Sequence, residues 1–155
     1  MIRYILLFIF SFFLLSSNHL FSQTSFTVET VPNPTKVSRG YIVDTSQKLT
    51  ANEIQNINEK LLILEKDTSV EFAIVILPSI GEANLKDFAV ALFSYWGIGK
   101  KEKDNGLLLL LVMGQRRWEF ETGYGLESVI PDATLKKIGE DELVPNYVWE
   151  KSEMV

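Results

Sequence analysis

The chain of 155 residues carries a formal net charge of −5 and contains no cysteine. An acidic balance argues against a nucleic-acid-binding protein, because such proteins present a basic surface to phosphates. The lack of cysteine excludes disulfides, thioether lipid anchors and zinc sites built on thiolates. The length allows one ordinary domain with its own hydrophobic core.

Residues 1–23 have the features of a signal peptide. Arg3 supplies a positive start, residues 4–15 are almost wholly apolar, and Ser22 offers a small residue near the expected cleavage point. The apolar run is shorter than the roughly 20 residues that a membrane-spanning helix needs. We therefore predict export to the periplasm or extracellular space, free or associated with a membrane, with no mature transmembrane segment. The alternative is an uncleaved anchor helix that reaches Phe21.

Residues 24–38 are predicted to be a linker, and residues 39–155 are predicted to form the folded domain. The linker prediction rests on Pro32, Pro34 and small polar residues that show no helical periodicity. The domain should open with a short strand that ends at Asp44, followed by a turn-prone polar stretch.

The first helix of the domain has a clear start signal. Thr50 and Glu53 form the capping-box pattern, in which each side chain binds the backbone of the other. The helix should end around Lys66–Asp67, before an apolar run over Val70–Leu77 that fits a strand buried on both faces. Apolar residues follow the cap at helical spacing and should face the core: Ile54, Ile57, Leu61 and Leu64, with Leu62 widening that face.

A second helix and a second buried strand follow. Asn84 is suited to cap a helix whose apolar residues continue to Trp96, and Gly97 should end it. Leu107–Met113 contains only Leu, Val and Met, which fits a central strand. Gly114-Gln115 is then too short for anything except a tight hairpin.

The last elements complete an α/β pattern. Residues 116–121 alternate between apolar and polar side chains and should form a strand with one exposed face. Pro131 suits the first turn of a helix that continues to Ile138, where Gly139 would end it. Helices that alternate with buried strands and precede a hairpin predict an α/β fold, a three-layer α/β/α sandwich with a mixed central sheet.

Several short motifs occur in an order that resembles the TPM domain family, which is also called YgcG-like. They are spread over residues 37–147, nearly all of the chain after the predicted signal peptide. The resemblance implies an α/β/α sandwich in an exported or lumenal protein. The motifs are Gly40-x-Ile42-x-Asp44, Leu49-Thr50-x-x-Glu53, Trp96-Gly97-Ile98-Gly99, Asp104-Asn105-Gly106, Arg117, Glu121-Thr122-Gly123-Tyr124-Gly125-Leu126-Glu127 and Pro131-Asp132.

The resemblance implies several functions without choosing among them. Family members look like proteins that bind calcium or other divalent cations, phosphatase activity is attributed to some, and maintenance of membrane-protein complexes to others. TPM domains usually continue with further helix after the segment that matches Pro145-Asn146-Tyr147, whereas this chain ends at Val155. We therefore expect the domain to be incomplete at its C-terminus.

Four acidic residues are candidate metal ligands: Asp44, Asp104, Glu121 and Asp132. They lie near the ends of predicted strands and helices, where ligands gather in α/β sheets. If the loops converge, carboxylate and carbonyl oxygens suit Ca²⁺ or Mg²⁺, which prefer oxygen ligands. The alternative is structural, because Asp44 also suits a turn, Asp132 suits a helix N-terminus and Asp104 begins a common turn sequence.

The residues do not identify a catalytic group. The only histidine, His19, lies within the predicted signal peptide, and there is no cysteine nucleophile. Hydrolysis would need metal-bound water, an Asp nucleophile or a pair of carboxyl groups. Gly123-Tyr124-Gly125 lacks the spacing of a P-loop or a dinucleotide fingerprint. We interpret it as a turn, with close approach to a phosphate as the alternative.

Three functions remain open from the sequence. The first is an exported protein that binds Ca²⁺ or Mg²⁺ through acidic loops and supports envelope or membrane-protein complexes. The second is a metal-assisted phosphatase that acts on phosphomonoesters, and the third is an interaction module with no metal. We expect a monomer with no organic cofactor and no nucleic-acid partner.

Overall fold

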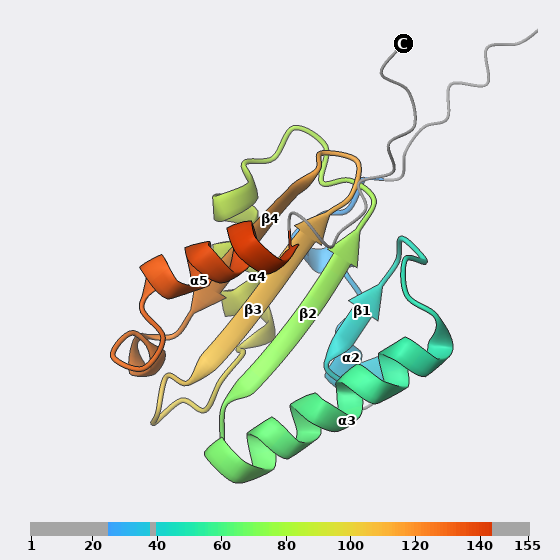
Figure 1. Ribbon diagram of the computed structural model, residues 1–155. Helices are drawn as coiled ribbons and strands as arrows, with labels where there is room; N and C mark the ends of the chain where they lie inside the picture. The colour runs from blue at the N-terminus through green and yellow to red at the C-terminus, as the bar shows by residue number, and fades with distance from the viewer. Residues whose placement is uncertain (1–24, 38–39, 144–155) are drawn as a thin grey trace, which may run out of the picture.

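The computed structural model describes residues 25–37 and 40–143 of the chain (Figure 1). Its centre is a four-stranded sheet in the order β1-β2-β3-β4. β1, β2 and β3 run parallel, and β4 pairs antiparallel with β3, so the sheet is mixed as the sequence predicts. The strands are β1 (Ile42–Asp44), β2 (Glu71–Leu77), β3 (Gly106–Val112) and β4 (Arg117–Thr122).

Helices cover both faces of this sheet (Figure 1), which confirms the predicted three-layer α/β/α sandwich. One face packs against α4 (Leu85–Trp96) and the short helix η1 (Val28–Thr30), the other against α3 (Ala51–Thr68) and α5 (Asp132–Ile138). Within the described part of the chain, no helix is long and apolar enough to cross a membrane. The shorter elements are α2 (Pro34–Val37), η2 (Tyr124–Leu126) and the π-helical turn η3 (Gly139–Leu143).

β3 is the buried central strand, and it contributes side chains to the core on both faces of the sheet. All of its residues are buried, because β2 and β4 flank it and helices cover both of its faces. Leu108 and Leu110 point toward α4, whereas Leu109 and Leu111 face the opposite layer. Full burial of one Leu side chain contributes about 2 kcal/mol relative to exposure. A strand buried on both faces needs no polar alternation, which explains its block of Leu and Val.

α3 begins at the predicted capping box. Thr50 Oγ1 accepts a hydrogen bond from the Glu53 N–H at 3.3 Å, and Glu53 Oε2 accepts one from the Thr50 N–H at 2.8 Å. The helix continues to Thr68, slightly beyond its predicted end. Leu61 is buried, but Leu62 is 57 % exposed, so the prediction that Leu62 widens the buried face is wrong. Successive helical residues diverge by about 100°, which turns Leu62 away from the sheet.

α4 has the predicted start and end. Asn84 Oδ1 accepts a hydrogen bond from the Asp87 N–H at 3.2 Å, as a helix cap should. Gly97 ends the helix in the left-handed conformation, with φ 65°. The side chains that face the sheet are spaced three or four positions apart, and the buried ones are Leu85, Phe88, Ala89 and Leu92.

Residues 25–37 are a packed part of the domain. Val31 is 4 % exposed and lies in the core cluster shared by α4 and the sheet. Phe26 packs against the same cluster, and its N–H donates a hydrogen bond to Ser79 O at 2.9 Å. The predicted linker over residues 24–38 is therefore corrected for this segment, because its apolar side chains fill space beside α4.

Tyr41 connects the start of β1 to α3. Its hydroxyl donates a hydrogen bond to the Glu65 carboxylate, and its N–H donates one to Asn58 Oδ1 at 2.7 Å. Burial first, and then the hydrogen bond and negative charge of Glu65, raise the pKa of Tyr41 to about 12. Each of these effects disfavours the phenolate form.

We predict that the free energy of unfolding falls as the pH rises from the ordinary tyrosine pKa of 10.0 to about 12. The pKa of Tyr41 is higher in the folded than in the unfolded chain, so its stabilisation is complete below the lower value and is lost above the higher one. Urea unfolding should show a smaller loss over this range in Tyr41→Phe than in wild type. Tyr95→Phe is the control, because Tyr95 is 61 % exposed. An equal loss in all three proteins would contradict this role of Tyr41.

Candidate functional site

The carboxylate of Asp44 holds the loop that follows β1. Asp44 Oδ1 accepts a hydrogen bond from the Ser46 N–H at 3.0 Å. Asp44 Oδ2 accepts hydrogen bonds from the N–H groups of Lys48 and Leu49, at 2.7 and 2.8 Å. Both carboxylate oxygens therefore bind backbone donors, which is the structural role that the sequence left open for this residue.

Asp44 lies at the opposite end of the sheet from Asp104. Strand pairing places Asp44 level with Ile76 of β2 and, through it, with Leu111 of β3, whereas Asp104 precedes Gly106 at the start of β3. The strand between these levels is about 16 Å long, at about 3.3 Å per residue. The expectation that all four carboxylates meet at one edge is therefore wrong for Asp44. Residues after β1 and before β3 lie at opposite ends of parallel strands.

Glu121 and Glu119 of β4 share Lys86, which lies in the first turn of α4. Lys86 Nζ is 2.7 Å from Glu121 Oε2 and 3.3 Å from Glu119 Oε1. Burial alone would lower the pKa of Lys86, but the hydrogen bond and charge of Glu121, and then those of Glu119, outweigh it and raise the pKa. Lys86 therefore stays protonated, and Glu121 is engaged in an ion pair.

The other two predicted ligands are exposed. Asp104 lies in the loop before β3, and Asp132 lies in the first turn of α5. Over residues 25–37 and 40–143, no group of three or more His, Asp or Glu side chains is placed to hold a metal ion. With Asp44 bound to backbone and Glu121 bound to a lysine, the four residues do not fit the predicted Ca²⁺ or Mg²⁺ site.

The glycine motifs join two loops by direct backbone contact. The N–H of Gly125 donates a hydrogen bond to Asp104 O at 3.0 Å, and the N–H of Gly123 donates one to Gly106 O at 3.0 Å. A Cβ on Gly123 would overlap the Asp104 carbonyl, and one on Gly125 would overlap the Lys103 carbonyl. Glycine is needed because only a bare Cα allows two backbones to approach this closely. The glycines thus have a structural role, in agreement with the interpretation of Gly123-Tyr124-Gly125 as a turn.

The buried side chain of Asn105 stabilises the same loop region by hydrogen bonds to backbone. Its side chain is buried, and its Nδ2 donates a hydrogen bond to Ser69 O at 2.6 Å. Its Oδ1 accepts a hydrogen bond from the Lys100 N–H at 3.0 Å. Because a buried amide is costly unless its polar atoms are paired, these bonds account for Asn at this position.

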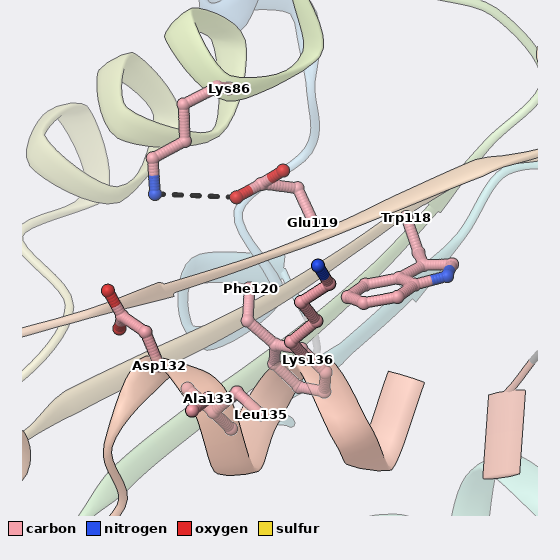
Figure 2. Close-up of a pocket in the computed structure, with 8 residues that line it drawn as sticks. All are labelled: Lys86, Trp118, Glu119, Phe120, Asp132, Ala133, Leu135 and Lys136. Atoms are coloured by element: carbon pink, nitrogen blue, oxygen red, sulfur yellow. Dashed lines mark ion pairs between the residues drawn. The ribbon is translucent and has the colours of Figure 1, made fainter. Parts of the chain in front are cut away.

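A groove of about 380 Å³ lies between α4, β4 and α5 (Figure 2). Trp118 and Phe120 meet edge to face, with ring centroids 5.9 Å apart. Figure 2 shows Lys86 and Asp132 extending from the two helices on either side. The site thus combines aromatic side chains with charged rims. We call it the β4 groove, and its lining residues are Lys86, Trp118, Glu119, Phe120, Asp132, Ala133, Leu135 and Lys136.

Sequence reasoning found only one residue of this groove as a site residue, Asp132. The alternation over residues 116–121 indicated an exposed strand face, but it carried no information about which helices flank that strand. Lys86 and Glu121 are 35 positions apart, so their pairing has no local signal. The groove depends on tertiary packing and was not predictable from spacing.

The fold and the β4 groove define an α/β/α domain with a solvent-accessible site at one edge of a mixed sheet. The family model of the TPM domain matches residues 42–151, well over half of the chain, and the chain therefore belongs to the TPM domain family. No curated protein matches the chain.

Two solved structures are similar to the chain. The solution NMR structure of the N-terminal domain of a protein from P. gingivalis is 41 % identical, with a TM-score of 0.73, over 79 % of this chain and 78 % of that one. The N-terminal domain of the cg2496 protein from Corynebacterium glutamicum is 14 % identical, with a TM-score of 0.56, over 76 % of this chain and 74 % of that one. The second likeness concerns the fold alone.

We predict that Gly125→Ala destabilises the domain by about 2 kcal/mol or more, because its methyl group would overlap the Lys103 carbonyl. Gly97→Ala is the matched control. A Cβ at Gly97 meets nothing within 4 Å, and only its φ of 65° opposes the change, at a cost of about 1 kcal/mol. Urea unfolding measures both. A Gly125→Ala protein as stable as wild type would disprove the close loop packing.

We predict that Asp44→Asn destabilises the protein by about 1–2 kcal/mol even in excess EDTA, because a carboxylate with three backbone donors becomes a neutral amide with one acceptor oxygen. Asp104→Asn should stay within about 0.5 kcal/mol of wild type, since Asp104 is exposed and Asn tolerates its φ of 45°. Thermal melts in EDTA compare the two. If Asp44→Asn mattered only with calcium present, Asp44 would be a metal ligand instead.

Proposed function

We propose that this TPM domain is an interaction module, and that the β4 groove is where its partner binds. The groove carries the proposal because it combines what protein-recognition sites use: large aromatic side chains and charged groups at the margin. Trp118 and Phe120 are only partly buried by the domain itself. A partner that covered them would remove further apolar surface from water.

We propose an exported protein whose partner is a membrane-protein complex of the cell envelope. The support is the predicted signal peptide over residues 1–23, which lies outside the described residues, together with the functions attributed to the family. The net charge of −5 does not oppose this, since a partner's basic loops would complement it.

Divalent-cation binding is a second candidate, and its support is the function attributed to the family, since no group of three acidic side chains in the described ranges is placed to hold an ion. Glu119 and Glu121 share the ammonium group of Lys86, and Asp132 is the exposed carboxylate of the same groove. Calcium titration by calorimetry on wild type and Asp132→Asn tests it. Heat at millimolar calcium that disappears in Asp132→Asn supports the candidate, and no heat in wild type removes it. Phosphatase activity is the remaining alternative from the family resemblance, and it would need metal-bound water, an Asp nucleophile or a pair of carboxyl groups.

We expect a photo-crosslinking amino acid at position 133 to give a discrete product in envelope membranes, because Ala133 lines the groove and is exposed. The same amino acid at position 56 is the control, since Asn56 is exposed on α3, away from the groove. Mass spectrometry identifies the product. It should persist in EDTA if the domain is a metal-free module. A product at neither position, or equally at both, would refute the proposed site.

A further inference from the structure

The free edge of β4 lies in the β4 groove. β4 is last in the sheet order, and no strand in the described ranges pairs with its outer side. α4 packs mainly against β4 on one face of the sheet. On the other face, Leu135 of α5 lies in the same apolar cluster as Phe120. A helix therefore stands on each side of the free strand edge.

The ladder between β3 and β4 identifies which backbone groups are free. The N–H of Gly123 donates to Gly106 O, one pair beyond the last residues of the ladder. Hydrogen-bonded pairs alternate along antiparallel strands, so every second residue before Gly123, including Glu119, bonds to β3. The backbone N–H and C=O groups of Trp118 and Phe120 therefore point outward, and both residues line the groove.

The two flanking helices determine the shape of an occupant. A second copy of the domain would bring its own α4 and α5 to the interface if the two β4 edges paired, and the four helices would compete for the same space. A single extended segment has no such layers. It can lie between the helices and pair with the outward backbone groups, as in recognition by strand addition.

One face of an added strand would meet aromatic side chains. Trp118 and Phe120 lie on the α5 side of the sheet, where both pack against Leu109 and Leu111 and Phe120 also packs in the cluster of Leu135. Successive side chains of a strand alternate between faces, so every second residue of the occupant would lie beside these rings. Apolar side chains at those positions would bury surface against Trp118 and Phe120.

The opposite face of the added strand would meet an excess of negative charge. Glu119 and Glu121 lie 3.3 and 2.7 Å from the single ammonium group of Lys86. The two carboxylates exceed this one positive charge, whereas Asp132 and Lys136 of α5 line the groove on the aromatic side. Basic side chains at the alternate positions would complement this charge.

We propose that the β4 groove binds an extended peptide segment in which apolar and basic residues alternate, and that this segment joins the sheet as a fifth strand on the outer edge of β4. The inference rests on the proposed function and adds to it the conformation and composition of the partner. The outward backbone groups supply the hydrogen bonds, and the two faces of β4 supply the selectivity.

The test uses a capped decapeptide of alternating Lys and Val, titrated into the ¹⁵N-labelled protein. We expect saturable shifts of the Trp118 and Phe120 amides, slower exchange of these amide protons, and a dissociation constant below about 1 mM, the weak end of specific recognition. A decapeptide of alternating Glu and Val should bind at least tenfold more weakly. No shift at millimolar Lys-Val peptide, or equal binding of both peptides, would overturn the proposal.

Two N-methylated forms of the Lys-Val peptide separate strand addition from simple charge attraction. One carries N-methyl groups on its Val residues and the other on its Lys residues. An added strand turns only alternate N–H groups toward its neighbour, so one form should bind and the other should not. If both forms bind like the parent, no ladder forms and the proposal fails. If the protein dimerises through β4 at NMR concentrations without peptide, the occupant is a second copy.

A charge variant completes the test. Glu119→Gln should raise the dissociation constant of the Lys-Val peptide about three- to fivefold, the range for a partly exposed ion pair. Glu102→Gln is the control, because Glu102 is an exposed carboxylate before β3, outside the groove, and should leave binding unchanged. Equal effects of the two variants would refute the contact. If position 133 gives its crosslinked product while no peptide binds, the interaction module stands and the extended-peptide proposal fails.

Discussion

The double burial of β3 is the constraint on which the rest of the domain depends. A strand buried on both faces needs a helical layer on each side, and its backbone needs a neighbour at each edge. β2 fills one edge in parallel, which requires the crossover through α4, and β4 fills the other by a short hairpin. The hairpin leaves β4 outermost, between the two layers. The groove beside β4 is therefore a consequence of how β3 is enclosed.

The same enclosure explains the glycine-rich motifs that are typical of the family. The chain must turn tightly at each end of β3. At the start of β3, the loop around Asp104 meets the loop around Gly125 backbone to backbone. The contact leaves no room for side chains at Gly123 and Gly125. Residues that look like a ligand-binding loop in sequence can thus be fixed by packing alone, and family membership need not imply that they touch a ligand.

Features that depend on neighbouring residues could be predicted from the sequence. Contacts between residues far apart in the chain could not. The caps at Thr50 and Asn84 and the apolar blocks of β2 and β3 depend on neighbouring residues, so pattern and spacing located them well. The meeting of the acidic residues depends on strand direction, which spacing does not encode. Asp44 and Asp104 were predicted to meet and lie at opposite ends of the sheet. The pairing of Lys86 with β4 likewise exists only once α4 has packed.

The packed segment over residues 25–37 has a consequence for proteolysis of the chain. Val31 lies in the core cluster that α4 shares with β2 and β3, and Phe26 packs against it, although both residues precede the first strand. A peptidase that cut within this segment would remove apolar side chains from the core and expose the inner face of α4 to water. A cut at the predicted site, Ser22-Gln23, would leave both Phe26 and Val31 in the chain. The packing of Phe26 and Val31 therefore places the N-terminal limit of the folded domain before the proline-rich stretch.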